Sequence, residues 1–225
     1  MSHRATLVSL LFLPLACSRV AGQAPAPQAP SATPSASAEE ERPSRKAMAD
    51  RKVGDFWVHR ISGSFSDQAM LLTERVVAKS DGDVTLEYTL EDSTLTTKLL
   101  VRHAIETDDV IEVRRVVDGK EEPGTLADYE SLMAKTALVP DSNEGFMTAK
   151  KGTCLVGPSE LDCETKSYRV MIGEKSATLD VTQSEKFPGR DISGEISAED
   201  GEVLYRAELL ESGHEGSSES SFAAR

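Results

Sequence analysis

Residues 84–91, VTLEYTLE, alternate apolar and polar side chains without interruption. Because successive side chains of a strand point to opposite sides, Val84, Leu86, Tyr88 and Leu90 would share one face. The threonines and glutamates between them would face water. This alternation is typical of a strand in an antiparallel sheet with one buried and one solvated face.

The same two-residue period continues along the chain. Residues 94–105 place Leu95, Leu99, Val101 and Ile105 on one face. Similar runs occur in DFWVHRIS, AMLLTERVVAK, DVIEVRRVVD, SYRVMI, ATLDVTQ, DISGEIS and EVLYRAELLE. Turn sequences such as SDGD and FPGR separate them, and glycine adopts the positive φ of tight turns at low cost. The pattern predicts a mainly β (α+β) fold: a curved antiparallel sheet or half-barrel of roughly ten strands.

One segment, residues 125–138, departs from this period. Thr125 is followed three residues later by Asp128, as in a capping box, and Pro140 ends the segment. The apolar positions recur at helical spacing: Leu126, Tyr129, Leu132 and Met133. We expect one amphipathic helix that buries this face against the sheet. The four residues are the candidate lining of a ligand cavity between sheet and helix, and a helix that only fills the core is the alternative.

The N-terminus is typical of a secretory signal. His3 and Arg4 precede about a dozen apolar residues, which end at LFLPLACS, residues 11–18. The run is shorter than the roughly 20 apolar residues that cross a bilayer. We therefore expect a signal rather than a transmembrane helix.

The end of this signal resembles a bacterial lipobox, in which the cysteine after a small residue is acylated and becomes the new N-terminus. Ala16 and Cys17 fit that pattern, whereas Pro14 stands where a lipobox prefers leucine. The resemblance implies a signal over residues 1–17 and lipidation at Cys17. The alternative is a plain secreted protein cleaved after Gly22.

Residues 18–47 are rich in proline, alanine and serine and have no periodic apolar face, so we expect a disordered tether. Residues 48–211 form the expected single β-rich domain, and residues 212–225 a disordered tail. Cys154 and Cys163 remain as an even pair under either cleavage. In an oxidising compartment they are expected to form a disulfide.

The net charge of −13 argues against nucleic acid as a partner, because phosphates require a basic surface. The sequence has no zinc-protease, P-loop, dinucleotide-binding or nucleophile-elbow motif, so we expect no enzyme, no cofactor and no metal. His59 and His103 alternate with apolar residues, which favours core histidines over catalytic ones.

Lipobox, tether and strand-rich domain together resemble bacterial envelope lipoproteins. The order of about ten strands and a helix resembles the LolA/LolB half-barrel class, over about residues 53–210 and without a shared motif. The resemblance implies a lipid-anchored envelope protein that binds a lipid or other apolar ligand. The alternative is an envelope scaffold or interaction protein with a filled core. Ser18 favours the outer membrane over other envelope locations, with a periplasmic or secreted protein as the alternative.

Overall fold

The computed structural model describes residues 48–66, 68–187 and 190–215 of the 225-residue chain. All of them belong to the compact unit Glu40–Arg225, the second of two into which the chain divides. The expected signal over residues 1–17 and the tether over residues 18–47 lie outside the described residues, as does most of the expected tail.

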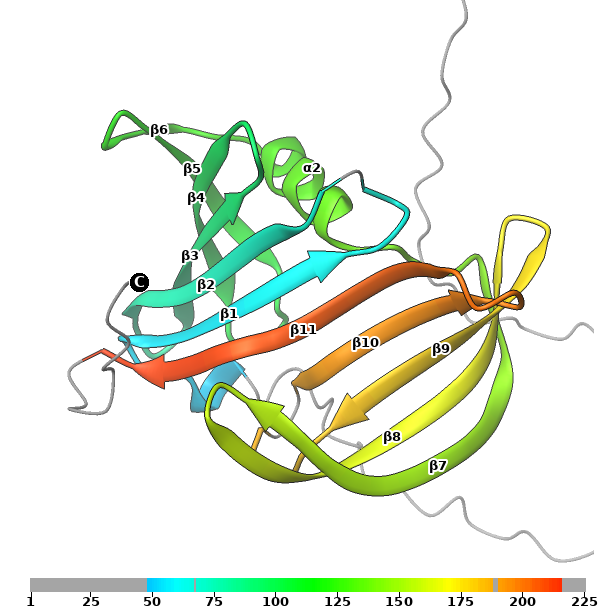
Figure 1. Cartoon of the computed structure of the whole chain (residues 1–225). Helices are drawn as coiled ribbons and strands as arrows, with labels where there is room; N and C mark the ends of the chain where they lie inside the picture. The colour runs from blue at the N-terminus through cyan, green and yellow to red at the C-terminus, as the bar shows by residue number, and fades with distance from the viewer. Residues whose placement is uncertain (1–47, 67, 188–189, 216–225) are drawn as a thin grey trace, which may run out of the picture. The chain divides into compact units, whose positions relative to one another are not determined.

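Within the described ranges, eleven strands form one antiparallel sheet, which confirms the predicted fold class. The sheet is open and strongly curved (Figure 1). The strands are β1 (Asp55–Ser62), β2 (Met70–Lys79), β3 (Asp83–Glu91), β4 (Thr96–Ala104), β5 (Val110–Val117), β6 (Lys120–Pro123), β7 (Ser142–Val156), β8 (Ser159–Ile172), β9 (Lys175–Gln183), β10 (Asp191–Ala198) and β11 (Val203–His214).

The strand order is β6-β5-β4-β3-β2-β1-β11-β10-β9-β8-β7. Consecutive strands therefore pair with each other, apart from β6 and β7, and β11 pairs with β1 in the middle of the sheet. β6 and β7 lie at opposite edges although they are consecutive strands. The chain that joins them must pass over a face of the sheet, and it does so through helix α2 (Leu126–Thr136).

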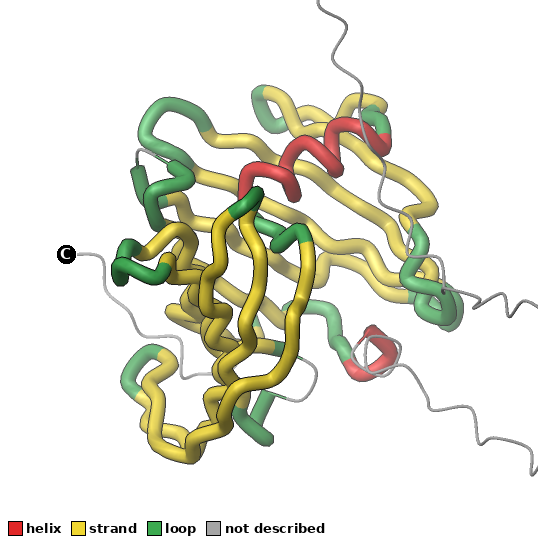
Figure 2. The backbone as a smooth tube through the Cα atoms, turned by 90° about the vertical axis from the view of Figure 1, so that its right-hand side faces the viewer, coloured by secondary structure: helices red, strands yellow, loops and turns green. Residues whose placement is uncertain are grey.

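The capping box predicted at the start of α2 is present. The backbone N–H of Asp128 donates to the Thr125 side chain, and the Asp128 carboxylate accepts from the Thr125 N–H at 2.7 Å. Figure 2 shows the helix crossing one face of the sheet, and its main contacts are with β4 and β5. At its end, the Tyr205 hydroxyl of β11 donates to the Thr136 carbonyl at 3.0 Å.

The face of the sheet beneath α2, here called the inner face, carries the main core. Pairing places Val76, Leu86, Val101 and Val113 in one row across β2 to β5. The alternation in residues 84–91 is the reason: Val84, Leu86, Tyr88 and Leu90 are all buried. The opposite, outer face carries ion pairs between neighbouring strands, including Arg60–Glu208 at 2.6 Å and Lys98–Glu87 at 3.1 Å.

The β7–β8 hairpin curls back toward the middle of the sheet. Val156 and Leu161, beside its turn, pack with Leu209 of β11 and with Trp57 of β1. The structure contains the expected disulfide between Cys154 and Cys163, with a Cα–Cα distance of 5.9 Å. β11 continues to His214, so residues 212–214, which the sequence placed in a disordered tail, belong to the sheet.

Candidate functional site

A groove of about 420 Å³ lies between α2 and the adjoining ends of β3, β4 and β5, and we call it the helix groove. Its volume falls within the range of roughly 300–1,000 Å³ that is usual for small-molecule sites. Its apolar lining is Leu90, Leu95, Leu99, Val116, Val117 and Leu132. Its polar lining is Thr96, Thr97, Lys98, Arg115, Asp118, Asp128, Ser131 and Lys135.

The apolar floor and the rim of the helix groove come from different kinds of segment. Leu90, Leu99 and Leu132 are buried core residues of β3, β4 and α2. Leu95 lies in the β3–β4 turn and is 56% exposed. An apolar side chain that is held open to solvent beside a buried apolar floor is a surface that an apolar ligand could cover.

A tight turn fixes Leu95 in this position. The carboxylate of Asp92 accepts hydrogen bonds from the N–H groups of Thr94 at 2.7 Å and Leu95 at 2.8 Å. These hydrogen bonds lower the pKa of Asp92. Those from Thr94 have the largest effect, that from Leu95 a smaller one, and the charge of Lys135 adds a little. The aspartate therefore stays ionised and keeps the turn closed at neutral pH.

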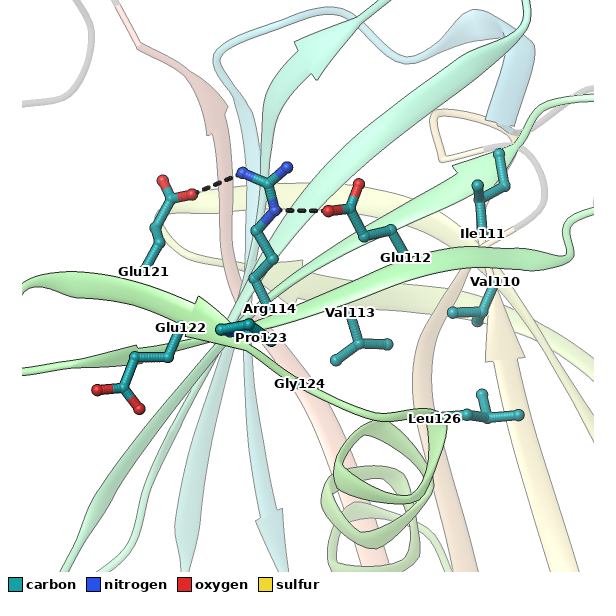
Figure 3. Close-up of a pocket in the computed structure, with 10 residues that line it drawn as sticks. All are labelled: Val110, Ile111, Glu112, Val113, Arg114, Glu121, Glu122, Pro123, Gly124 and Leu126. Carbon is teal, nitrogen blue, oxygen red and sulfur yellow. Dashed lines mark hydrogen bonds and ion pairs between the residues drawn. The ribbon is translucent and has the colours of Figure 1, made fainter.

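A second groove, of about 640 Å³, lies along β5 and β6 beside the start of α2, and we call it the edge groove (Figure 3). Arg114 projects over it and donates to Glu112 at 2.7 Å and to Glu121 at 2.9 Å. Ile111 and Leu126 supply exposed apolar surface. Three of its four charged side chains, Glu112, Arg114 and Glu121, already pair with one another.

The four predicted helix residues do not line one common cavity. Leu132 is 2% exposed, belongs to the core and lines the helix groove, whereas Tyr129 and Met133 pack half-buried against the core. Leu126 was expected to face the sheet, but it is 52% exposed and lines the edge groove. It is the first residue of α2, where the helix has only begun to cross the sheet.

Sequence reasoning missed most of the helix groove. Leu90 and Leu99 were identified as core residues, but nothing in their spacing shows that a groove reaches them. Leu95, directly after EDST, was expected on the apolar face of the next strand with Leu99 and Val101, but it lies in the β3–β4 turn and is exposed. Such a residue is either buried by a neighbouring element or left open, and only the position of α2 decides between these outcomes.

The inner face also holds a buried charged cluster next to Trp57. Glu74 of β2 receives hydrogen bonds from Arg51 at 2.5 Å and from Arg190 at 2.9 Å. Burial by itself would raise the pKa of Glu74, but the charges of Arg190 and Arg51 outweigh it and lower the pKa. The cluster holds Arg51, which precedes β1, and Arg190, which precedes β10, against the sheet.

Both core histidines lie on the inner face, as the sequence indicated. Burial and the nearby charge of Arg190 lower the pKa of His59 from 6.5 to about 4. His103 is buried against the rings of Tyr88 and Tyr129, and burial lowers its pKa as well. Both side chains are therefore neutral at physiological pH, as expected of packed residues rather than of proton donors.

The described residues contain no group of three or more His, Cys, Asp or Glu side chains that could hold a metal ion. No helix in these ranges is long and apolar enough to cross a membrane. Cys17, the expected lipidation site, lies outside the part of the chain that the structure describes.

Comparisons with known proteins give no family for this chain. No family model and no curated protein matches it in sequence. Among solved structures, a hypothetical protein from Chlamydia trachomatis is 11% identical, with a TM-score of 0.44, over 80% of this chain and 96% of that protein. MucB is 15% identical, with a TM-score of 0.41, over 80% of this chain but only 58% of MucB.

Two further likenesses are weaker. The complex of MucA and MucB from Pseudomonas aeruginosa contains a chain 14% identical to this one, with a TM-score of 0.39, over 75% of this chain and 54% of that chain. A putative exported protein with a YmcC-like fold from Bacteroides fragilis is 8% identical, with a TM-score of 0.35, over 72% and 97%. TM-scores this low do not establish a common fold, so no function follows from them.

Proposed function

We propose that this protein is a lipid-anchored protein of the bacterial envelope that binds a lipid or other apolar ligand in the helix groove. The observation that carries the proposal is the exposed side chain of Leu95 beside the buried floor of Leu90, Leu99 and Leu132. Covering this surface would remove apolar area from water, which contributes roughly 25 cal/mol per Å².

The envelope location rests on the sequence. The signal-like N-terminus, Ala16–Cys17 at its end and the proline-rich segment behind it support export followed by anchoring. A disulfide between Cys154 and Cys163 is in keeping with an oxidising compartment. The outer membrane is the favoured destination because Ser18 follows the cysteine, and a periplasmic or secreted protein is the alternative.

We propose a binding role rather than catalysis. His59 and His103, the two histidines on the inner face, are packed and neutral. Neither lines the helix groove.

The second candidate is an envelope scaffold with a filled core. It is favoured by the burial of Leu132, which leaves 2% of its surface exposed, and by the packing of Tyr129 and Met133 against the same core. In this case the helix groove would be an ordinary surface depression and the protein would act through a protein partner.

One substitution separates the two candidates. Leu95→Asp places a charge in the helix groove, and Ile111→Asp, at a residue 48% exposed in the edge groove, is the matched control. We expect a fluorescent apolar dye to bind the parent protein and Ile111→Asp, and to lose its site in Leu95→Asp. The scaffold is favoured instead if the parent protein binds no dye.

Native mass spectrometry of protein purified from its own membrane provides the second measurement. We expect the parent protein to retain a co-purified apolar molecule and Leu95→Asp to lose it. A ligand that the parent protein and Leu95→Asp retain equally would place the binding site elsewhere.

A further inference from the structure

The two edges of the sheet differ greatly in length. β6, at one edge, has four residues, whereas β7, at the other, has 15 (Figure 1). A strand at an edge presents N–H and C=O groups that another chain can pair with, and short edge strands limit this. β7 is therefore the edge of this sheet that is available to a partner.

The C-terminal part of β7 is regular. Its pairing with β8 is interrupted twice, between Asn143 and Gly145 and between Phe146 and Thr148, and it then runs without interruption over residues 148–156. The Cys154–Cys163 disulfide joins the two strands within this stretch. We call residues 148–156 the edge segment. A cross-linked strand is already ordered, which reduces the entropy lost when a partner binds.

The edge segment is basic in an acidic protein. Lys150 and Lys151 are adjacent and exposed, and the chain has a net charge of −13. Glu164 is paired opposite Lys151 in the sheet, but its carboxylate lies 3.3 Å from the Nζ of Lys166 instead. Lys150 and Lys151 therefore offer positive charge to groups outside the sheet.

Gly152 and Leu155, in the same edge segment, also favour the approach of a partner. A Cβ added at Gly152 would meet no atom within 4 Å, so the packing of this fold does not require glycine there. Glycine in a strand often marks a place where another backbone approaches. Leu155 is 68% exposed and lies on the same side of the strand as Lys151, because the two are four residues apart.

We propose that the edge segment binds an extended acidic segment of another polypeptide, which adds to the sheet as a further antiparallel strand. Two adjacent carboxylates of the partner lie opposite Lys150 and Lys151. An apolar side chain four residues before the first carboxylate lies opposite Leu155. This is recognition by strand addition, in which backbone hydrogen bonds give affinity and alternate side chains give specificity.

A second copy of this chain is a poorer occupant of the same edge. Antiparallel pairing of two copies about the lysine pair would place Lys150 and Lys151 opposite lysines, and like charges directly opposite are destabilising. Lysine on an edge strand is also a common protection against self-association. The charge that rejects a second copy is the charge that selects an acidic partner. This inference does not depend on the helix groove.

The test uses two labelled peptides, TLTVTEETV and its basic counterpart TLTVTKKTV, and measures fluorescence anisotropy with the full-length protein. We expect the acidic peptide to bind the parent protein, and the double variant K150E/K151E to bind it about tenfold or more weakly, because two attractive pairs become repulsive. The basic peptide should prefer that variant. The matched control is K120E/K175E, which changes the net charge equally at two other exposed lysines and should bind like the parent.

Amide hydrogen exchange distinguishes strand addition from a general effect of charge, because charge alone would not protect the backbone amides of one strand. Amides of the edge segment should gain protection when the acidic peptide binds, while those of β6 should not. Equal affinity of the acidic peptide for the parent protein and K150E/K151E, or no binding to either, would overturn the proposal. It would also fail if the parent protein dimerises through β7, or if only vesicles of anionic phospholipid, and not the peptide, respond to the lysine substitutions.

Discussion

The guanidinium carbon of Arg190 lies 4.1 Å from the centre of the Trp57 ring, and the same guanidinium donates to Glu74. Arg51 approaches the same ring at 5.2 Å. Desolvated contacts of this kind between a cation and an aromatic ring are worth up to about 2 kcal/mol. Arg51 and Arg190, from segments far apart in sequence, thus meet strands β1 and β2 around one buried carboxylate.

Removing that carboxylate should destabilise the protein strongly. Glu74→Ala leaves two buried arginines without their shared partner, and a broken buried pair costs about 3–5 kcal/mol. Urea unfolding measures the loss. The control is Glu208→Ala, whose partner Arg60 lies on the outer face with 48% of its side chain exposed, and which should cost no more than about 1 kcal/mol. Equal losses in the two variants would contradict the role assigned to the cluster.

Stability should also depend on pH through His59. The pKa of His59 is lowered from 6.5 to about 4, so between these values the unfolded chain binds a proton that the folded protein does not. The contribution of neutral His59 is therefore complete above pH 6.5 and is lost as the pH falls toward 4, by up to about 3 kcal/mol. The pKa of His103 is lowered too, which adds to this loss of stability. The pKa of Glu74 is also lowered, so protonation of Glu74 destabilises the fold further below its ordinary pKa of 4.5.

A comparison with His59→Asn isolates this contribution. We expect the free energy of unfolding of the parent protein to fall more steeply than that of the variant between about pH 6.5 and pH 4.5. Parallel curves over this interval would show that His59 takes up its proton equally in both states.

Two leucines of α2 should respond very differently to truncation. Leu132→Ala removes a side chain that is almost fully buried and should cost about 2–5 kcal/mol. Leu126→Ala, on the same helix but half exposed, should change stability by no more than about 0.5 kcal/mol. Denaturant unfolding gives both values. A small loss at Leu132 together with altered binding of an apolar dye would show that the helix covers a ligand rather than a filled core.

The anchor is tested at the mature N-terminus. If Cys17 is lipidated, mass spectrometry of protein from a producing bacterium should find a chain that begins at Cys17 and carries acyl groups. Cys17→Ala should leave the protein out of the detergent-extracted membrane fraction. An unmodified chain beginning at Gln23 would instead support plain secretion with cleavage after Gly22.

Local periodicity predicted helix α2 and nine of the eleven strands that the structure describes, because each depends on neighbours in sequence, whereas β6 and β7 correspond to none of the alternating runs. The alternation at residues 84–91 became β3 with its apolar residues buried, and Thr125 with Asp128 became the capping box of α2. The disulfide was predictable from an even number of cysteines, and Gly157 and Pro158 between them indicated the hairpin loop, but nothing in the sequence shows that this hairpin curls back to pack against β11. Glu74 was missed, because a glutamate between apolar strand residues gives no local sign of the arginines that approach it from distant segments.

The sequence by itself determined that the chain forms a one-sided antiparallel sheet with a single long helix, since side-chain alternation and capping act over a few residues. Only the tertiary structure decided that β11 pairs with β1, so that β6 and β7 lie at opposite edges and α2 must cross the inner face. That crossing buries Leu132 and leaves Leu126 and Leu95 open, while the strand order leaves the long strand β7 at an edge. These outcomes depend on which strands meet across the whole chain, and such contacts leave no periodic trace in the sequence.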